Sequence, residues 1–263
     1  MELEINIIDA FTNTRFGGSA AAVIITNQWL GDHLMQAIAT ENNLSETAFL
    51  LKQAPDEYQI RWFSPVAEID FCGHATLASA FVIFSKNPKI NTLRFFAEAV
   101  GEMPITRSHD GRVVMDFPNR PPKPVEQVPN DLIKGLSIQP TEVLRNSQAY
   151  FAIYEKEEDI YQLEQHPEVL KNLAPYDVVV TAHSKEYDFV SRYFWPSNGG
   201  AEDPVTGSIH TGLTPYWSEK LGKPELIAFQ ASKRGGLIFC QLKGDRVIIS
   251  GKAIQYLKGI IEV

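Results

Sequence analysis

The residues best suited to proton chemistry lie in two short stretches of the sequence and at one isolated acid. "CGHATL" places a thiol, Cys72, and an imidazole, His74, at the start of a presumptive helix, and "EDPVTGS" places Asp203 ahead of a second one. Glu46, in "NNLSETAFLL", heads an apolar segment typical of an interior strand. A shielded carboxylate at such a boundary can move protons. A solvated acid, a structural histidine and a buried apolar thiol are the alternative interpretations.

The same two stretches predict a site for an anion. The first turn of a helix has unpaired backbone N–H groups and a partial positive charge, so it binds carboxylate without a lysine. Gly73 and Gly207 would let a ligand approach the backbone, and Ser208 adds a hydroxyl donor. The alternative is a plain helix start in which Asp203 is the N-cap and Pro204 the first helical residue.

The position of Cys72 and His74 beside a helix N-terminus also predicts their protonation. The positive end of the helix should lower the pKa of an imidazole and keep it neutral. It should equally acidify a thiol, which could then act as a base toward a carbon acid. None of the six histidines lies in an HxH or HExxH pattern, and no GxGxxG or GxxxxGK[ST] motif occurs, so neither a metal nor a cofactor is expected.

Composition excludes several classes of partner. The formal net charge is -8, and no basic run offers a track for phosphate backbones, so nucleic acid is not expected. The N-terminus lacks a signal-like pattern and no stretch of 18 apolar residues occurs, so we expect a cytoplasmic protein without a membrane partner. Two cysteines are too few for a disulfide framework.

A repeated motif indicates two similar lobes. "RWFSP" at 61–65 recurs as "RYFWP" at 192–196, and each copy leads to an acid, a glycine and a presumptive helix. The helix predicted at 73–86 is apolar on every side and should be buried, whereas the second contains Pro215 and should be kinked or shorter. Strand-like segments surround both helices. The sequence therefore predicts an α+β protein of two lobes with a cleft between them, in which strands form a barrel or a strongly curved sheet around a central helix.

Taken together, these residues resemble the phenazine-biosynthesis isomerase (PhzF) family. The resemblance rests on "NLSETAFL", "RWFSPVAEIDFCGHATLASA", "EDPVTGSIHTGLTPYW", "KRGG" and "RVIISGKA", and spans nearly the whole chain. It implies the fold of diaminopimelate epimerase, with two pseudo-symmetric lobes, and it implies a homodimer. We expect a first lobe at 1–117, joined by the returning segment 253–263, a Pro-rich linker at 118–129, and a second lobe at 130–252.

The resemblance also implies an activity. Glu46, the glutamate of the S-E-T motif, would be the general acid/base of a cofactor-independent isomerase that moves a proton on a small carboxylate, amino-acid-like or dihydro-hydroxyanthranilate-like. His74 and Asp203 would assist, while Gly73, Gly207, Ser208 and Cys72 would contact the substrate. The alternatives are an amino-acid racemase or epimerase using Cys72, and a binding protein that keeps the cleft without turnover. The family usually has Asn and Pro where this chain has Ser19 and Ala20, so the resemblance does not name the substrate.

Overall fold

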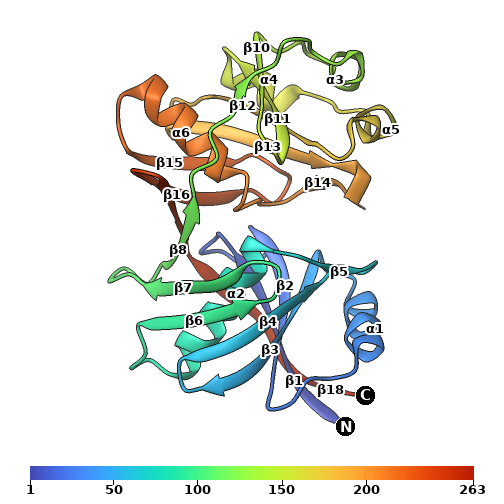
Figure 1. Cartoon of the computed structure of the whole chain (residues 1–263), viewed down its shortest axis with the longest axis vertical. Helices are drawn as coiled ribbons and strands as arrows, with labels where there is room; N and C mark the ends of the chain where they lie inside the picture. The colour runs from blue at the N-terminus through green and yellow to red at the C-terminus, as the bar shows by residue number, and fades with distance from the viewer. Residues whose placement is uncertain (199) are drawn as a thin grey trace. The chain divides into compact units, whose positions relative to one another are not determined.

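The chain divides into two compact units in the computed structural model, which describes residues 1–198 and 200–263. The first unit comprises Met1–Asp116 and Ser250–Val263, and the second comprises Phe117–Ile249 (Figure 1). The Pro-rich stretch at 118–129 belongs to the second unit and contains a short strand, β9 (Lys123–Pro124). Each unit is described by itself below.

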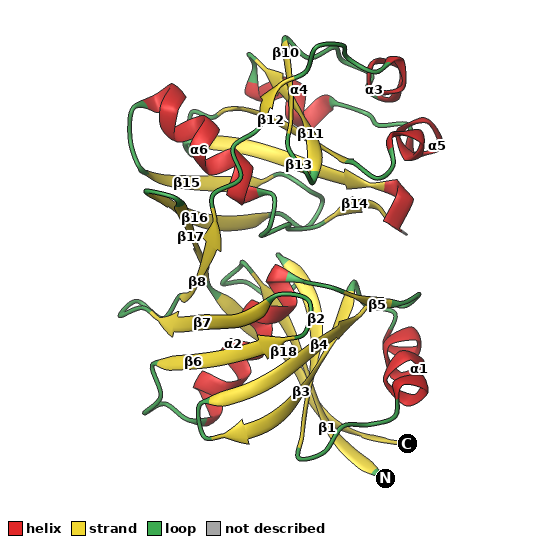
Figure 2. Cartoon of the chain, viewed as in Figure 1, coloured by secondary structure: helices red, strands yellow, loops and turns green. Residues whose placement is uncertain are grey.

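The first unit is a strongly bent sheet with a helix packed against it (Figure 2). Its central strand, β4, pairs with β3 on one edge and with both β5 and β6 on the other. The remaining pairings run from β3 to β2, β1 and β18, and from β6 to β7 and β8. The strands are β1 (Glu2–Ala10), β2 (Ser19–Thr26), β3 (Glu46–Ala54), β4 (Glu57–Phe63), β5 (Glu68–Ile69), β6 (Thr92–Ala97), β7 (Gly101–Arg107), β8 (Val113–Pro118) and β18 (Ala253–Glu262).

Helix α2 (Gly73–Lys86) is buried along most of its length, as its apolar composition predicts. It packs against β1, β2, β3 and β18. The returning C-terminal strand β18 therefore joins the sheet of the first unit, through β1, and contributes to the core around the helix. A second helix, α1 (Asp32–Asn42), buries one face through Met35, Ile38 and Ala39. The sheet and α2 together fix where the first residues of β3 and of α2 lie.

In its described residues, the second unit consists of nine strands, one long helix and several short ones. Its strands are β9, β10 (Glu142–Arg145), β11 (Ala149–Tyr154), β12 (Asp177–His183), β13 (Phe189–Trp195), β14 (Gly200–Asp203), β15 (Glu225–Gln230), β16 (Gly236–Lys243) and β17 (Arg246–Gly251, which ends in the first unit). Its helices are α3 (Asn130–Gly135), α4 (Glu157–Gln162), α5 (Pro167–Leu170) and α6 (His210–Leu221), with 3₁₀ turns at Lys171–Leu173 and Pro196–Asn198.

The two units share one pattern of strand pairing, which confirms the pseudo-symmetry predicted from the repeated motif. In the first unit β2–β3 and β4–β6 are parallel, while β1–β2, β3–β4, β4–β5 and β6–β7 are antiparallel. In the second unit the pairs β11–β12 and β13–β15 are parallel, while β10–β11, β12–β13, β13–β14 and β15–β16 are antiparallel. The motif occupies the same place in both, because Arg61 on β4 pairs with Glu68 on β5 as Arg192 on β13 pairs with Glu202 on β14.

The start of the second helix differs from its counterpart. Helix α2 begins at Gly73, but α6 begins at His210, three residues after Gly207, and Pro215 lies inside it. Turns in which His210 and Thr211 donate to the carbonyls of Gly207 and Ser208 lead into α6. Helix α6 is shorter than α2, as its proline predicted, and it is buried over most of its first two turns.

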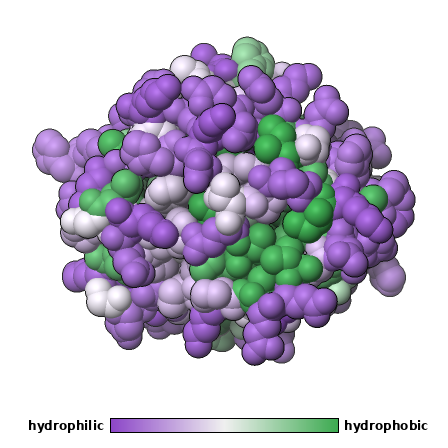
Figure 3. Space-filling view, turned by 90° about the horizontal axis from the view of Figure 1, so that it is seen from above, coloured by the Kyte–Doolittle hydropathy of each residue, from purple (hydrophilic) through white to green (hydrophobic). Residues whose placement is uncertain are grey.

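The face drawn in Figure 3 carries mostly polar side chains. Hydrophobic residues form one larger group right of its centre and smaller groups elsewhere, and exposed apolar residues are ordinary in folded proteins. None of the helices in the described part of the chain combines the length and apolar character that crossing a membrane requires.

Candidate active site

Glu46 is the first residue of β3, in the interior of the first unit's sheet. Its position on β3 lies opposite Ala21 of the parallel strand β2, and the next residue, Thr47, lies opposite Phe63 of β4. The residue is only 3% exposed, although a carboxylate is seldom fully buried unless it has a partner. The apolar run after Glu46 places the strand in the core, and so the acid at its start is removed from solvent.

Cys72 and His74 flank the first residue of α2. Cys72 is the N-cap, and its Sγ accepts a hydrogen bond from the backbone N–H of Ala75 at 3.4 Å. The hydroxyl of Thr76 donates to the carbonyl oxygen of Cys72 at 2.6 Å. A thiol thus takes the capping role that Ser, Thr or Asp usually takes, which holds the sulfur and the first turn in a fixed relation.

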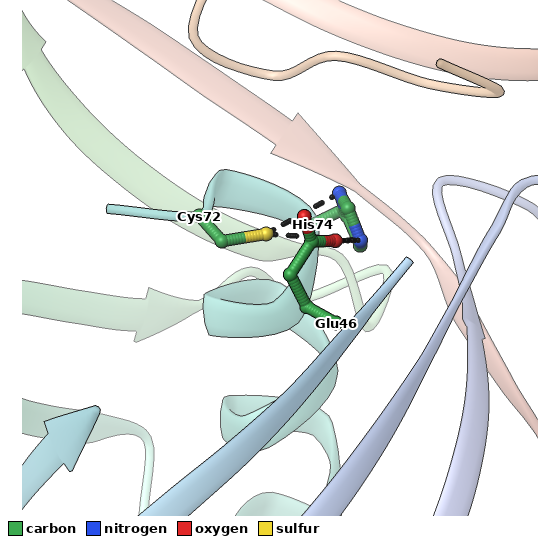
Figure 4. Close-up of side chains that lie close together, drawn as sticks. All are labelled: Glu46, Cys72 and His74. Carbon is green, nitrogen blue, oxygen red and sulfur yellow. Dashed lines mark hydrogen bonds and ion pairs between the residues drawn. The ribbon is translucent and has the colours of Figure 1, made fainter. Parts of the chain in front are cut away.

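The structure brings Glu46, Cys72 and His74 together (Figure 4). Oε2 of Glu46 lies 2.7 Å from Nε2 of His74, and Sγ of Cys72 lies 3.4 Å from Nδ1 and 3.7 Å from Nε2 of the same ring. The Glu46–His74 contact is as short as an ion pair, but its direction is not that of a hydrogen bond, and Oε2 has no hydrogen-bond partner in the described residues. That oxygen therefore keeps its capacity to take a proton from elsewhere.

The environment of Cys72 reverses the protonation predicted for its thiol. Burial, and then the neighbouring Glu46 carboxylate, raise the pKa of Cys72 to about 11, against smaller opposing contributions from His74 and from the backbone N–H of Ala75. The prediction of an acidified thiol was wrong because it weighed the helix end without burial and without the acid. At neutral pH Cys72 is a thiol and not a thiolate.

His74 is also protonated differently from the prediction. Burial alone lowers the pKa of the imidazole, but the neighbouring Cys72 and Glu46 outweigh burial and raise the pKa of His74 well above its usual value. The raised pKa favours a protonated ring, in place of the neutral imidazole expected from the helix end.

The three side chains also present oxygen, sulfur and nitrogen atoms within 4.8 Å of one another, a donor set of the kind that zinc accepts. Two ligands of one tetrahedral zinc ion are roughly 3.3 Å apart, because each zinc–ligand bond is about 2 Å long. Nε2 and Oε2 are 2.7 Å apart, so they contact each other instead of being spaced around a common ion. The arrangement fits proton exchange better than metal binding.

In the second unit, Asp203 has a different role from the helix cap that the sequence also allowed. It is the last residue of β14, and its Oδ2 accepts a hydrogen bond from the Thr206 hydroxyl at 2.7 Å. The amide of Gln230 donates to the carbonyl oxygen of Asp203 and accepts from the backbone N–H of Thr206, both at 2.8 Å. The residue at the N-cap position of α6 is Ile209, so Asp203 is fixed in a buried polar turn.

Ser208 belongs to a second polar chain in the same unit. The amide of Gln148 donates to Oγ of Ser208 at 2.9 Å and to the Tyr193 hydroxyl at 3.0 Å, and Tyr193 in turn donates to Asp177 at 2.6 Å. Sequence reasoning missed Gln148, Tyr193 and Asp177. No motif marks them, because they come from different strands and loops that only the fold brings together.

The site residues predicted from the sequence thus fall into two groups. Glu46, Cys72 and His74, with Gly73 between the last two, form a contiguous buried cluster in the first unit. Asp203, Gly207 and Ser208 lie in the second unit, within one polar turn that leads into α6.

Comparisons with known proteins agree with this picture. The family model described as phenazine biosynthesis-like protein (PhzC-PhzF) matches residues 8–259. The chain is 44% identical to an uncharacterized isomerase of Pseudomonas aeruginosa, with 100% of both chains covered. It is 39% identical to the mouse phenazine biosynthesis-like domain-containing protein 2, with 99% of each covered.

Solved structures show the same likeness. A PhzF-family protein from Enterococcus faecalis superposes with a TM-score of 0.95 at 38% identity, covering 100% of both chains. A hydroxyproline epimerase from Agrobacterium vitis superposes with a TM-score of 0.59 at 11% identity, covering 99% of this chain and 92% of that one, which is a likeness of fold alone. The predicted epimerase-like fold class is thereby confirmed.

Proposed function

We propose that this chain, which belongs to the phenazine biosynthesis-like (PhzC/PhzF) family, is an isomerase. In this proposal, Glu46 carries a proton between two positions of a small carboxylated substrate. The isomerase class agrees with its relatives in Pseudomonas aeruginosa and Halalkalibacterium halodurans, which are themselves named isomerases. The observation that carries the proposed role is the 2.7 Å contact between the buried Glu46 carboxylate and His74 at the start of α2.

The contact suits a base that must also act as an acid. In this proposal Glu46 accepts a proton from carbon while His74 lies 2.7 Å from its Oε2. After the transfer the substrate carries negative charge, and the imidazolium beside it stabilises that charge. Glu46, now protonated, returns the proton to another carbon of the substrate, so atoms and charge balance without an oxidant or a cofactor.

We assign the binding of the substrate carboxylate to groups at the start of α2 and in the turn that leads into α6. The N-terminal turn of α2 starts at Gly73, where the absence of a side chain lets an anion approach the backbone N–H groups. We assign Cys72 to contact with the substrate as a thiol. Asp203, Gly207 and Ser208 complete the proposed set, with Asp203 assisting proton transfer and the other two binding the substrate.

The experiment that tests this role is deuterium incorporation followed by NMR. The protein would be offered a panel of amino acids and cyclic dihydro-carboxylates in D₂O, with Glu46→Gln and Cys72→Ala alongside. We expect incorporation by the wild type and by Cys72→Ala, and its loss in Glu46→Gln. Exchange at the wild-type rate by Glu46→Gln would overturn the assignment. Loss in Cys72→Ala alone would select a racemase based on the thiol, and saturable binding without exchange would select a binding protein.

The homodimer implied by family resemblance is part of the proposal, and sedimentation equilibrium tests it.

A further inference from the structure

The first unit contains a cavity that does not include Glu46, Cys72 or His74 among its lining residues. Its volume is about 760 Å³, within the range of small-molecule sites, and it is lined by residues of β4, β5 and β6 and of the segments beside them. Trp29 and Phe96 supply aromatic surface, and Phe96 is half exposed, while Trp62 lies buried in the wall. Nothing in the proposed isomerisation uses this cavity.

The cavity lies where the sheet splits. β4 pairs with β6 through Glu57–Gln59 and with β5 through Trp62 and Phe63. Within the described chain, the pairing registers therefore leave Ile60 and Arg61 without a strand partner on that edge of β4. Both residues line the cavity. The cavity thus lies beside a part of the β4 edge that no strand covers, and small molecules bind in concave sites of this kind.

The charged groups of the lining favour a cation. Arg61 is the single basic side chain among the lining residues, and its guanidinium is already bound by Asp32 at 2.8 Å and by both oxygens of Glu68 at 2.6 Å. Two further lining carboxylates, Asp70 and Glu98, have no hydrogen-bond or ion-pair partner in the described part of the chain. The lining thus holds three carboxylates against one neutralised cation, beside aromatic rings that also attract positive charge.

One buried donor in the wall also lacks a partner. Trp62 is 1% exposed, and its Nε1 has no hydrogen-bond acceptor among the described residues. The neighbouring Trp29 differs, since its Nε1 donates to Oε1 of Gln59 at 3.1 Å. A buried N–H without an acceptor is costly. Because this atom is closed off from solvent, a ligand in the cavity would reach it only if the wall moved.

We propose that this cavity is a binding site for a small organic amine that is protonated and carries an apolar body. The ammonium group would pair with the carboxylates of Asp70 and Glu98, and the apolar body would pack against Phe96 and Trp29. The site is separate from the one that holds the carboxylated substrate, and its charge preference is opposite. The wall of the cavity contacts the segment that precedes α2. The Trp62 ring packs on Phe71, the residue before Cys72, with ring centroids 5.5 Å apart.

Calorimetry with three probes of matched shape tests the proposal. L-phenylalaninol carries an ammonium group, 3-phenylpropane-1,2-diol replaces it by a hydroxyl, and 3-phenyllactate carries a carboxylate instead. We expect saturable binding of phenylalaninol at one site per chain, weaker binding of the diol, and no binding of phenyllactate at this cavity. Raising the salt concentration should weaken phenylalaninol binding, because partly exposed charges are screened.

Variants locate the binding. Asp70→Asn and Glu98→Gln should each weaken phenylalaninol binding about threefold, and together about tenfold, since partly exposed ion pairs are worth that much. Glu41→Gln, at an exposed acid on α1 that does not line the cavity, is the matched control and should bind as the wild type does. Glu46→Gln should also leave binding unchanged, which separates this site from the catalytic one. Equal binding of all three probes, no effect of the Asp70 and Glu98 changes, or no saturable binding would overturn the proposal.

Discussion

Replacing Glu46 by glutamine should change the protonation of His74, and this can be measured without knowing the substrate. The change keeps the size of the side chain and removes its charge. In the wild type the pKa of His74 is raised well above its usual value, with burial opposed and outweighed by Cys72 and Glu46. Without the acid, burial and a neutral thiol are what the ring faces, so the pKa of His74 should fall below its usual value of about 6.5.

The stability of the protein should follow with a definite sign. In the wild type, a His74 pKa raised above its unfolded value stabilises the fold fully below about pH 6.5, and this stabilisation is lost as pH rises through the folded pKa. In Glu46→Gln the sign reverses, because a lowered pKa makes stability fall as pH drops below about 6.5. Each unit of difference between the folded and unfolded pKa corresponds to about 1.4 kcal/mol.

The cost of the substitution follows from the burial of the pair. Glu46 is 3% and His74 4% exposed, and removing one member of a buried ion pair typically costs about 3–5 kcal/mol when the other stays charged. His74 can instead release its proton, so we expect a loss of about 1–3 kcal/mol at pH 6.5 and less at pH 9.

Two measurements check this reasoning. Long-range ¹⁵N–¹H NMR of the imidazole gives the protonation state of His74, and urea unfolding at pH 6.5 and pH 9 gives the stability. His74→Gln is the comparison variant, since it has no titrating ring. A His74 that titrates at its ordinary pKa in the wild type, or that titrates identically in Glu46→Gln, would refute the assigned ion pair.

Three further predictions concern other residues. Burial raises the pKa of Cys72 to about 11 and of Cys240 to about 12, so a disulfide reagent at pH 8 should react slowly with the folded protein and with both thiols after unfolding in urea. Burial lowers the pKa of His210 to about 4, so its ring should stay neutral by NMR at pH 5.5, and protonation there would contradict the placement of α6. Gly18→Ala should lower the free energy of unfolding by at least about 3 kcal/mol, because φ is +64° and a Cβ would lie 2.0 Å from the carbonyl oxygen of Ala10. Gly101→Ala, with φ +83° and no atom within 4 Å of the added Cβ, should lower it by only about 1 kcal/mol. Equal losses in the two variants, measured by urea unfolding, would contradict the argument.

Part of the fold was predictable because its signals are local. The apolar helix at 73–86, the turn "KRGG" between β15 and β16, and the apolar strand after Glu46 each follow from composition over a few residues. The repeat was predictable because "RWFSP" and "RYFWP" keep the arginine that pairs with an acid on the next short strand. Strands β2 and β11 are harder to predict, since "SAAAVIIT" and "AYFAIY" are apolar runs that periodicity alone does not distinguish from buried helix.

The sequence indicates which residues form the site, but it does not indicate their protonation states. Glu46 and His74 are far apart in sequence, and only the pairing of β3 within the sheet and the packing of α2 against it bring them into contact. The predicted protonation of Cys72 and His74 was wrong for the same reason. The helix end was visible in the sequence, whereas burial and the neighbouring carboxylate, which decide the outcome, are properties of the folded chain.

The pseudo-symmetry gives this difference a structural explanation. Both units keep the arginine–glutamate pair on equivalent strands. The strands that precede the helix are therefore arranged alike in the two units. What differs is the helix entry: Cys72–Gly73–His74 enters α2 directly, while Thr206–Gly207–Ser208 makes an extra turn before α6. A carboxylate–imidazole contact therefore exists at the first entry, and hydroxyls and an aspartate lie at the second. The acid/base role proposed for Glu46 thus depends on a helix that begins directly after Cys72, because that start places His74 beside the acid.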